Sequence, residues 1–496
     1  MKRNYKPEGR RHRRRNWQRG YSRWQNNERY RLEAASGSTN SSTSAGSSGS
    51  AQSSSVPELP GFYYDPEKNR YFRLLPGHNN CNPLTKEEIV KKEMEKKRLL
   101  HLEEEKKRKK SSRPGLNASL LLQKQQLGLL PSTTYCRRFH ELKVGCMERK
   151  EVSLVNPEPI GAGTHNYEFI LADSACDRLF VVNDVENGFC KYGLLNLNGL
   201  WKDVPTVESH DHPYFTNQKV VTACWASMNA PDSHVLVCLL GKPEAPGCVS
   251  LMPAWYFRNM AANYDDVRPE VVYNIRISNA WTCAWCLNPL LECSFAAGLQ
   301  NQVLVLNTVT NVQHTYRTGS DVLAQQFATQ TLLLYNGCRS GEVFSIDLRV
   351  PYISPNKWKK GVSFSQSSSI ACLRLLKDEN YMVVSDMSGQ IKLWDLRMVK
   401  YVQKYEGHVN SYAHLPVHVK DDDGLLLAVG QDCYTRIWNF QDAQLLRTIP
   451  SPHPASKDSI PSVAFSSYQG GSRPVPGLLM AVKKDLYHFT YGSNDN

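Results

Sequence analysis

The sequence predicts an all-β fold in which short strand units repeat around a ring. One observation is the segment SDMSGQIKLWDLR at 385–397, where a Ser-Gly turn precedes alternating apolar residues and a Trp-Asp pair. Alternation with a period of two indicates a half-buried strand, and a Trp-Asp pair at its end is typical of one blade of a WD-repeat propeller. The second observation is that closely similar segments recur at 340–349 and 432–439.

Weaker copies of the same segment extend the pattern to seven. Most spacings between copies lie near the ~40–45 residues of a WD repeat, and the longer ones require insertions. We therefore expect a seven-bladed WD-repeat β-propeller over 135–496, with six or eight blades as alternatives. The residues at the Asp or Asn position of successive copies are Asn183, Pro253, Asn307, Asp347, Asp395, Asn439 and Thr490.

Short apolar segments precede most of these copies, where the first strand of a blade is expected. They lie at 221–226, 281–286, 322–327, 370–375 and 462–465. The last blade would lack an outer strand, and we expect residues 148–155 to supply it. Closing the ring in this way removes an open sheet edge.

Positive charge is concentrated before the propeller. The formal net charge of the chain is +13, and residues 1–33 alone hold twelve Lys or Arg and three Glu. Residues 1–35 are expected to form a basic disordered tail, because they cannot bury enough apolar surface to fold alone. Three interpretations of the tail remain open: a nuclear import signal at 10–15, nucleic-acid binding through interleaved Arg, Trp and Tyr, and a solubilising extension.

A linker and a hairpin follow the tail. Residues 36–56 are rich in Ser, Gly, Ala and Thr, which is typical of a flexible linker. Within 57–82, aromatic segments at 62–64 and 70–74 flank the turn sequence DPEKN, so we expect a two-stranded hairpin. Two strands alone are marginally stable, which favours docking on the propeller or a partner over peptide binding by the hairpin itself.

Two helices are expected between the hairpin and the propeller. Residues 85–113 are helix-forming and mostly charged, without a continuous apolar stripe, which favours a solvated helix. Residues 116–131 are leucine-rich, and Gly128 is placed to end this second helix. From the residues alone, its apolar face suits packing on the propeller rim and insertion into a partner's groove equally well.

The sequence contains no familiar catalytic or cofactor motif. P-loop, HExxH and GxSxG motifs are absent, and we expect no cofactor, metal or catalytic residue. The pair Cys283 and Cys286 lies in a predicted strand, which points residues three apart to opposite faces. No apolar run reaches the ~18 residues that span a bilayer, so no membrane partner is expected.

One cluster of polar and aromatic residues mimics a catalytic site. His408, Asp432 and Trp438 occupy the Gly-His and Trp-Asp regions of one repeat. These positions are signatures of the repeat, so we expect the three residues to hydrogen-bond to one another and fix a turn.

An Arg follows the Asp position in two neighbouring copies. In a strand, Asp347 and Arg349 lie on the same side, as do Asp395 and Arg397, so each Asp can orient the following guanidinium. Consecutive blades then place both Arg side chains near one rim, where their planar forks suit a carboxylate-bearing partner. The alternative is that both are solvated surface ion pairs of little energetic value.

These boxes, IDLR at 346–349 and WDLR at 394–397, resemble the WDxR boxes of the WD-repeat substrate receptors of cullin-4 RING ubiquitin ligases. The segment LLQKQQLGL at 121–129 is similar to the short leucine helix that such receptors insert into their adaptor. Longer stretches of 57–496 also resemble a receptor of this class. The first box has Ile346 where the family has Trp.

The resemblance implies a non-catalytic receptor that joins a substrate protein to the ligase. Its expected partners are the damaged-DNA-binding adaptor protein, cullin-4 and the RING subunit through that adaptor, and a substrate protein of unknown identity. We expect it in the nucleus and cytoplasm, with the nucleus favoured. A nuclear nucleic-acid-associated WD-repeat scaffold and an assembly platform with inert Arg pairs remain alternatives. The residues assigned to adaptor binding are Asp347, Arg349, Asp395, Arg397, Leu121, Leu122, Leu127 and Leu129.

Overall fold

The structure is a computed structural model of residues 1–496, in which residues 1–83 and 84–496 form two separate units. The predicted basic tail and linker, residues 1–56, lie outside the described residues. The described residues are 62–65, 70–73, 86–107, 117–155, 166–185, 189–201, 204–209, 214–241, 246–257, 273–277, 279–456, 459–466 and 477–491.

The first unit contains the hairpin that the sequence predicts. Strands β1 (Phe62–Asp65) and β2 (Arg70–Arg73) pair antiparallel, with Phe62 opposite Arg73 and Asp65 opposite Arg70. The turn sequence between the two aromatic segments therefore sets the register of the strands.

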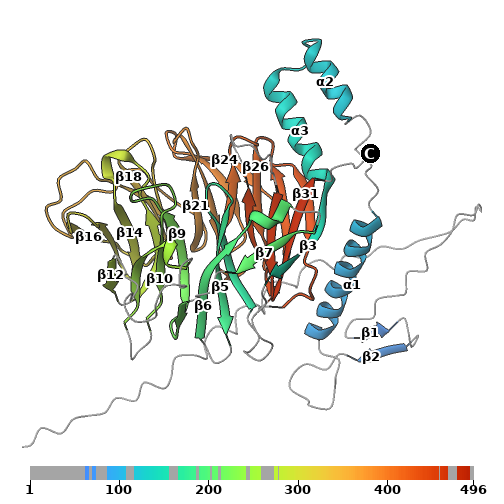
Figure 1. Cartoon of the computed structure of the whole chain (residues 1–496), viewed down its shortest axis with the longest axis horizontal. Coiled ribbons are helices and arrows are strands. Elements are labelled where there is room, and N and C mark those ends of the chain that lie inside the picture. The colour runs from blue at the N-terminus through green and yellow to red at the C-terminus, as the bar shows by residue number, and fades with distance from the viewer. Residues whose placement is uncertain are drawn as a thin grey trace, which may run out of the picture. The chain divides into compact units, whose positions relative to one another are not determined.

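The described part of the second unit contains five four-stranded antiparallel sheets and one nine-stranded sheet, in which β3 joins two blades. We divide these sheets into seven blades and number them in chain order (Figure 1). Blade 1 comprises β4 (Asn166–Ala172), β5 (Arg178–Val185), β6 (Phe189–Asn196), β7 (Thr206–Ser209) and β8 (Tyr214–Thr216). Blade 2 comprises β9 (Val220–Ala226), β10 (His234–Leu239), β11 (Cys248–Pro253) and β12 (Tyr273–Arg276). Blade 3 comprises β13 (Ala280–Trp285), β14 (Ser294–Leu299), β15 (Gln302–Asn307) and β16 (Gln313–Arg317).

The remaining blades have four strands each, like blades 2 and 3. Blade 4 comprises β17 (Val322–Phe327), β18 (Leu333–Cys338), β19 (Glu342–Asp347) and β20 (Ser363–Ser365). Blade 5 comprises β21 (Ile370–Leu375), β22 (Tyr381–Asp386), β23 (Ile391–Asp395) and β24 (Lys400–Tyr405). Blade 6 comprises β25 (Val417–Lys420), β26 (Leu425–Val429), β27 (Tyr434–Asn439) and β28 (Leu445–Pro450). Blade 7 comprises β29 (Ser462–Ser466), β30 (Gly477–Val482), β31 (Asp485–Tyr491) and β3 (Met147–Val155).

The apolar core lies between the blades rather than in one central mass. Within the described residues it separates into seven clusters, each shared by two neighbouring blades. The cluster between blades 5 and 6, for example, contains Val383 and Ile391 from one sheet and Leu426 and Trp438 from the other. Because seven interfaces join seven blades, the sheets close into a ring, as the sequence predicts.

The two ends of the propeller chain close the ring. Strand β3 pairs antiparallel with β31, from Met147 opposite Tyr491 to Val152 opposite Leu486. The outer strand of the last blade therefore comes from the start of the propeller, which confirms the prediction for 148–155. Ser153 of β3 also begins a short parallel pairing with Thr206 of β7, so one strand joins blades 7 and 1.

Blade 1 departs from the assignment made on sequence. We placed Asn183 at the Asp or Asn position, which belongs to the third strand of a blade, but Asn183 lies in the second strand, β5. The third strand is β6, and it ends at Asn196. The error arises because β5 and β6 are both apolar and strand-like, and nothing local distinguishes a second strand from a third.

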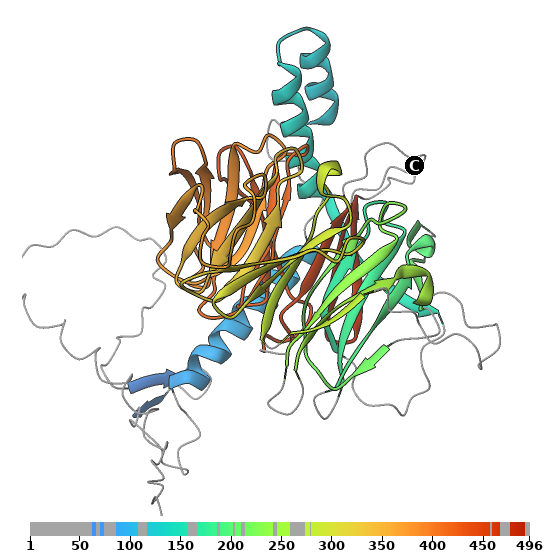
Figure 2. The same cartoon turned by 90° about the vertical axis from the view of Figure 1, so that its left-hand side faces the viewer.

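Three helices precede the propeller: α1 (Lys86–Lys107), α2 (Ala118–Gln126) and α3 (Ser132–Cys146). Helices α2 and α3 form a hairpin that stands away from the sheets in two perpendicular views (Figures 1 and 2). We expected the propeller to begin at residue 135, but residues 132–146 form helix α3 instead. In the described part of the chain no helix is both long and apolar enough to cross a lipid bilayer.

Helix α1 is docked, which corrects the expectation of a solvated helix. Arg98 is 4% exposed and donates from Nη1 to the carbonyls of Ser451 and Pro452 at 2.7 and 3.2 Å. His101 meets the ring of Tyr434 edge-on at 5.9 Å. These contacts are polar and aromatic, so a search for an apolar stripe could not reveal the docked face.

Three short 3-10 helices lie in connections between strands of the described chain. They lie at Asn198–Trp201, Ala254–Phe257 and Pro289–Leu291.

Candidate partner-binding site

The site begins with a turn that ends the third strand of several blades. At this position a side-chain oxygen accepts a hydrogen bond from the backbone N–H two residues later, which is an Asx turn. Asn196, Asn307, Asp347, Asp395 and Asn439 all make this contact, at 2.9–3.1 Å. The recurring Asp or Asn therefore turns the chain out of the strand, and it presents the second residue after itself on one face of the ring.

In blade 4 the presented residue is Arg349. Its Nε donates to Asp347 Oδ1 at 2.9 Å, and its Nη2 donates to Oδ2 at 2.6 Å. This two-point pairing fixes the plane of the guanidinium. The Arg349 side chain remains 67% exposed, so its outer edge is open to a partner.

In blade 5 the presented residue is Arg397, held in the same way. Its Nη2 donates to Asp395 Oδ2 at 2.9 Å and to the Tyr381 hydroxyl at 3.2 Å. The guanidinium carbon lies 5.5 Å from the centre of the Tyr381 ring, within cation–π range. The Arg397 side chain is 60% exposed.

Both pairs are fixed in charge at physiological pH. The hydrogen-bonded guanidinium of Arg349 lowers the pKa of Asp347, and that of Arg397 lowers the pKa of Asp395 to about 2. A carboxylate with a lowered pKa keeps its pairing above its ordinary value and loses it only as the pH falls through the lowered one. The two arginines are therefore oriented throughout the range in which a partner binds.

Exposed apolar side chains follow the two arginines in the chain. Val350 and Met398 directly follow them and are 58% and 65% exposed, and Ile353 on the same blade 4 loop is 70% exposed. A patch with oriented cations beside apolar groups is typical of an interface that binds another protein.

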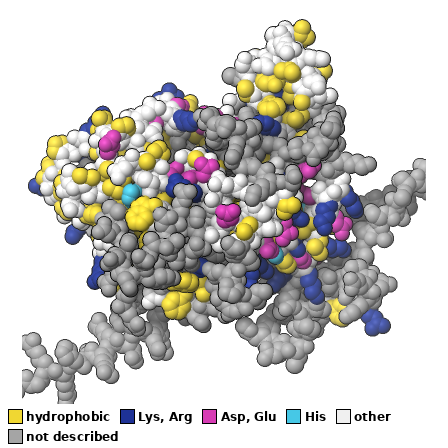
Figure 3. Space-filling view, in the orientation of Figure 1, with side chains coloured by type: hydrophobic (Ala, Val, Ile, Leu, Met, Phe, Trp, Pro, Cys, Tyr) yellow, Lys and Arg dark blue, Asp and Glu magenta, His cyan; other side chains and the backbone are white. Residues whose placement is uncertain are grey.

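The hairpin supplies a second patch, which Figure 3 shows as a group of hydrophobic side chains on α2 and α3. Leu122, Leu127 and Leu129 are 44%, 72% and 68% exposed. Leu121 is only 5% exposed, and α2 contacts α3, so we assign Leu121 to the interior of the hairpin rather than to a partner surface.

The end of α2 fixes how two of these leucines are displayed. The N–H of Gly128 donates to the carbonyl of Gln125 at 3.0 Å, and that of Leu129 to Lys124 at 2.8 Å. This pair of bonds is a Schellman motif, which requires a left-handed residue, and Gly128 has φ +71°. Gly128 therefore places Leu127 and Leu129 on either side of a sharp turn, as the sequence predicts for the helix end.

The hairpin is attached to the same face of the ring as the arginines. Asn439 occupies in blade 6 the position that Asp347 and Asp395 occupy in blades 4 and 5, and its Nδ2 donates to Glu141 of α3 at 2.9 Å. Val144, near the end of α3, is fully buried in the cluster between blades 6 and 7. Three consecutive blades thus carry Arg349, Arg397 and the base of the hairpin.

Arg447 of β28 locks the base of the hairpin to α1. Its Nη1 donates to the carbonyls of Val144 and Met147 at 2.8 and 2.9 Å, and its Nη2 donates to Glu105 of α1 at 3.0 Å. Arg447 is 6% exposed. One buried guanidinium therefore joins both helical elements to blade 6.

His408, Asp432 and Trp438 are arranged differently from the prediction. His408 lies 3.0 Å from the Val429 carbonyl, and Trp438 donates to the Glu406 carbonyl at 2.9 Å. Asp432 pairs with Arg436, which is 2.5 Å away. The three residues do bind the local backbone and a neighbour, but the described contacts include none that joins them to one another, because Arg436 takes the carboxylate.

Comparison with known proteins decides the family. Residues 135–491 match the family model described as "DDB1- and CUL4-associated factor 4 beta-propeller domain". The chain belongs to the DDB1- and CUL4-associated factor 4 family.

Relatives in this family match most of the chain. It is 55% identical to "DDB1- and CUL4-associated factor 4" of Homo sapiens, over 89% of this chain and 88% of that protein. It is 49% identical to "DDB1- and CUL4-associated factor 4-like protein 2" of Homo sapiens, over 80% of this chain and all of that protein. "WD repeat-containing protein 21" of Schizosaccharomyces pombe is 20% identical over 77% of this chain.

Within this family fold, the structure brings together most of the residues that sequence suggested. Arg349, Arg397 and their Asp partners lie at equivalent points of adjacent blades, and the leucine hairpin rises from the next blade. Sequence reasoning missed Arg447 and Glu141, because each is a single charged residue in a segment with no motif. Their role is seen only in the fold, because their partners lie about 300 residues away in the sequence, as Asn439 does from Glu141.

Proposed function

We propose that this chain is the substrate receptor of a cullin-4 RING ubiquitin ligase, and that it binds the ligase through the DDB1-type adaptor. The relatives' names associate those proteins with DDB1 and CUL4. A receptor in such an assembly carries no catalytic group itself, because ubiquitin transfer belongs to the RING subunit and its conjugating enzyme.

The observation that carries the proposal is the pair of oriented arginines beside the leucine hairpin. Arg349 and Arg397 are pinned by Asp347 and Asp395 yet remain mostly exposed. Exposed ion pairs add little to stability, so this arrangement is better explained by binding than by folding. Arg is also enriched among the residues that dominate protein interfaces.

The test is co-purification of the adaptor with wild type and with the double variant Arg349→Ala, Arg397→Ala. We expect the double variant to lose the adaptor while keeping the melting temperature of the wild type. Arg339→Ala is the matched control, because Arg339 pairs with Asp321 at 3.0 Å and is 48% exposed, but lies at the other end of the blade 4 strands. Full retention of the adaptor by the double variant would contradict the proposal.

We also propose a mainly nuclear location, directed by the basic segment 10–15. Deleting residues 1–33 should move a fluorescent fusion to the cytoplasm without affecting adaptor binding. The alternative of a nucleic-acid-associated scaffold predicts salt-sensitive RNA or DNA binding that the same deletion abolishes.

A further inference from the structure

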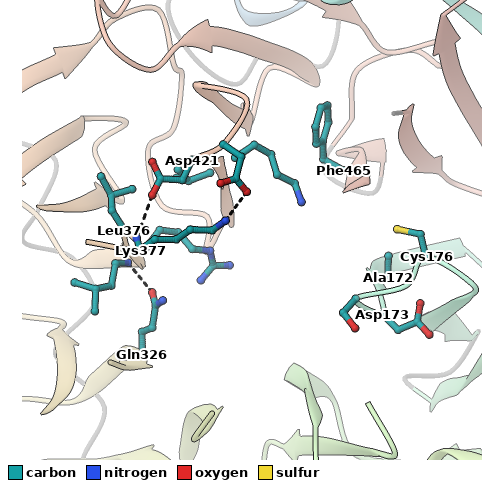
Figure 4. Close-up of a pocket in the computed structure, with 14 residues that line it drawn as sticks. Ala172, Asp173, Cys176, Gln326, Leu376, Lys377, Asp421 and Phe465 are labelled. Atoms are coloured by element: carbon teal, nitrogen blue, oxygen red, sulfur yellow. Dashed lines mark hydrogen bonds and ion pairs between the residues drawn. The ribbon is translucent and has the colours of Figure 1, made fainter. Parts of the chain in front are cut away.

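The face that carries the two arginines also holds a cavity at the centre of the ring. Its volume is about 580 Å³, and it is lined by the ends of first strands from blades 1, 4, 5, 6 and 7. First and third strands of a blade run in the same direction, so these ends share a face with Arg349 and Arg397. In Figure 4, Asp173 and Cys176 lie across the cavity from Leu376 and Lys377.

The acidic groups of the lining already have partners. Asp173 accepts from Arg178 Nε at 2.8 Å and from two backbone N–H groups. Asp421 accepts from the backbone N–H of Lys377 at 3.1 Å, and Asp422 pairs with the Lys377 ammonium. These carboxylates are therefore hydrogen-bonded, but they keep negative charge at the edge of the cavity.

Arg374 is different, because its positive charge has no counter-ion among the described residues. Its one described hydrogen bond runs from Nη1 to the carbonyl of Leu373 at 3.0 Å, which leaves most of its N–H donors unused. Lys420 lines the same cavity. Burial, with Arg374 and Lys420 nearby, lowers the pKa of His418 to about 3, so the histidine stays neutral beside them.

The charge pattern selects the kind of anion. A carboxylate matches the guanidinium fork of Arg374 in charge and shape. A polyphosphate would bring several charges close to Asp173, Asp421 and Asp422, and would be repelled. The remaining lining includes Ala172, Leu375, Leu376, Val419 and Phe465, which suits the apolar parts of a peptide.

We propose that this cavity binds a carboxylate of a substrate polypeptide, with Arg374 as its main contact. The inference rests on the proposed receptor function and adds the class of substrate. The carboxylate comes from a chain terminus or from an Asp or Glu side chain, and the two sources share the same chemistry.

The test is selection of short random peptides by the purified full-length chain, alone and bound to the adaptor. Three pools are compared: free C-termini, amidated C-termini, and free C-termini with Asn and Gln in place of Asp and Glu. A terminal carboxylate predicts loss of binders from the amidated pool, and a side-chain carboxylate predicts loss from the pool without Asp and Glu. Equal recovery from all three pools would overturn the proposal.

The variant Arg374→Met should weaken the selected peptides about tenfold or more, and Arg374→Lys should restore part of the affinity. Lys357→Met is the matched control, because Lys357 is an exposed cation on a blade 4 loop outside the cavity. Unchanged peptide affinity in a folded Arg374→Met variant would overturn the proposal.

Adaptor binding separates this proposal from the proposed function. We expect Arg374→Met to retain the adaptor, and the peptides to bind the receptor–adaptor complex as tightly as the receptor alone. Loss of the adaptor in Arg374→Met, or displacement of the peptides by the adaptor, would assign the cavity to the adaptor interface instead. The double variant of Arg349 and Arg397 tests only the proposed receptor function, and its loss or retention of the adaptor does not test peptide binding in the cavity.

Discussion

Replacing Arg447 by Met should release the helical hairpin from the propeller while leaving the propeller folded. The substitution removes the only cation that pairs with Glu105 in the described structure, whose side chain is 18% exposed. It also removes the donor to the carbonyls of Val144 and Met147, two almost fully buried residues. Methionine fills similar space but offers none of these hydrogen bonds.

The cost follows from the burial of these groups. Removing one partner of a buried ion pair typically costs about 3–5 kcal/mol, because the other charge is left without compensation. Glu105 retains some solvent contact, which favours the lower part of that range. For a cooperative unit of roughly 350 residues, the span of the family match, each kcal/mol lowers the melting temperature by about 1–1.5 °C. We therefore expect a decrease of about 3–6 °C.

The assay combines calorimetry with hydrogen–deuterium exchange. Calorimetry measures the loss of stability, and exchange shows where it is located. We expect faster exchange in residues 117–146 and in α1, with the protection of blades 2–5 unchanged. Adaptor affinity should fall as well, since the hairpin no longer keeps a fixed angle to Arg349 and Arg397.

Arg436→Met is the control for this experiment. Arg436 is also an arginine of blade 6 that is mostly shielded from solvent, with its side chain 11% exposed and paired with Asp432, but it contacts neither α1 nor α3 in the described contacts. It should lower the melting temperature without faster exchange in the hairpin. A change of less than about 1 °C in Arg447→Met, with wild-type exchange in residues 117–146, would refute the reasoning.

Three further predictions concern the hairpin and the acid stability of the ring. Gly128→Ala, at φ +71°, should cost about 1–2 kcal/mol and weaken adaptor binding, whereas Gly145→Ala, which meets open space at an ordinary φ, should do neither. Leu129→Ser should weaken adaptor binding at an unchanged melting temperature, and Leu121→Ala should instead lower the melting temperature, because only Leu121 is buried. Burial lowers the pKa of His488 from 6.5 to about 4. As the pH falls, the unfolded chain therefore binds a proton before the folded chain does. The free energy of unfolding should be full above about pH 6.5 and about 2 kcal/mol lower at pH 5. Denaturant titrations of His488→Gln should show a flatter pH profile, and an unchanged profile would contradict this assignment.

The repeat architecture was predictable because each blade repeats the same local chemistry. A turn, alternating apolar residues and a final Asp or Asn recur because the third strands pack on both faces, and five of them end in an Asx turn, as at Asp347 and Asp395. The closing strand was predictable by elimination, since a blade with three strands needs a fourth. Blade 1 was assigned incorrectly because its insertions hide which apolar strand is the third.

The parts that could not be predicted depend on contacts distant in sequence. Helix α1 docks through Arg98 and Glu105, and such polar contacts leave no apolar stripe to detect. The central cavity is built from five blades, so its lining residues never appear together in any segment of sequence. Arg374 looks like an ordinary strand residue in the sequence, and only the fold shows that it lines the cavity without an ion pair among the described residues.

The geometry of the ring explains why one face can carry both the partner site and the cavity. In an antiparallel blade the first and third strands run the same way, so the inner strands and the Asx turns end on a common face. The inner ends, near Arg374, surround the axis, and the turns that display Arg349 and Arg397 lie farther out. The hairpin rises from the equivalent turn of blade 6, where Asn439 binds Glu141 in place of presenting an arginine. An adaptor held by the rim and the hairpin would therefore contact blades 4 to 6, and a peptide could still reach the axis from the side of blades 1 and 7.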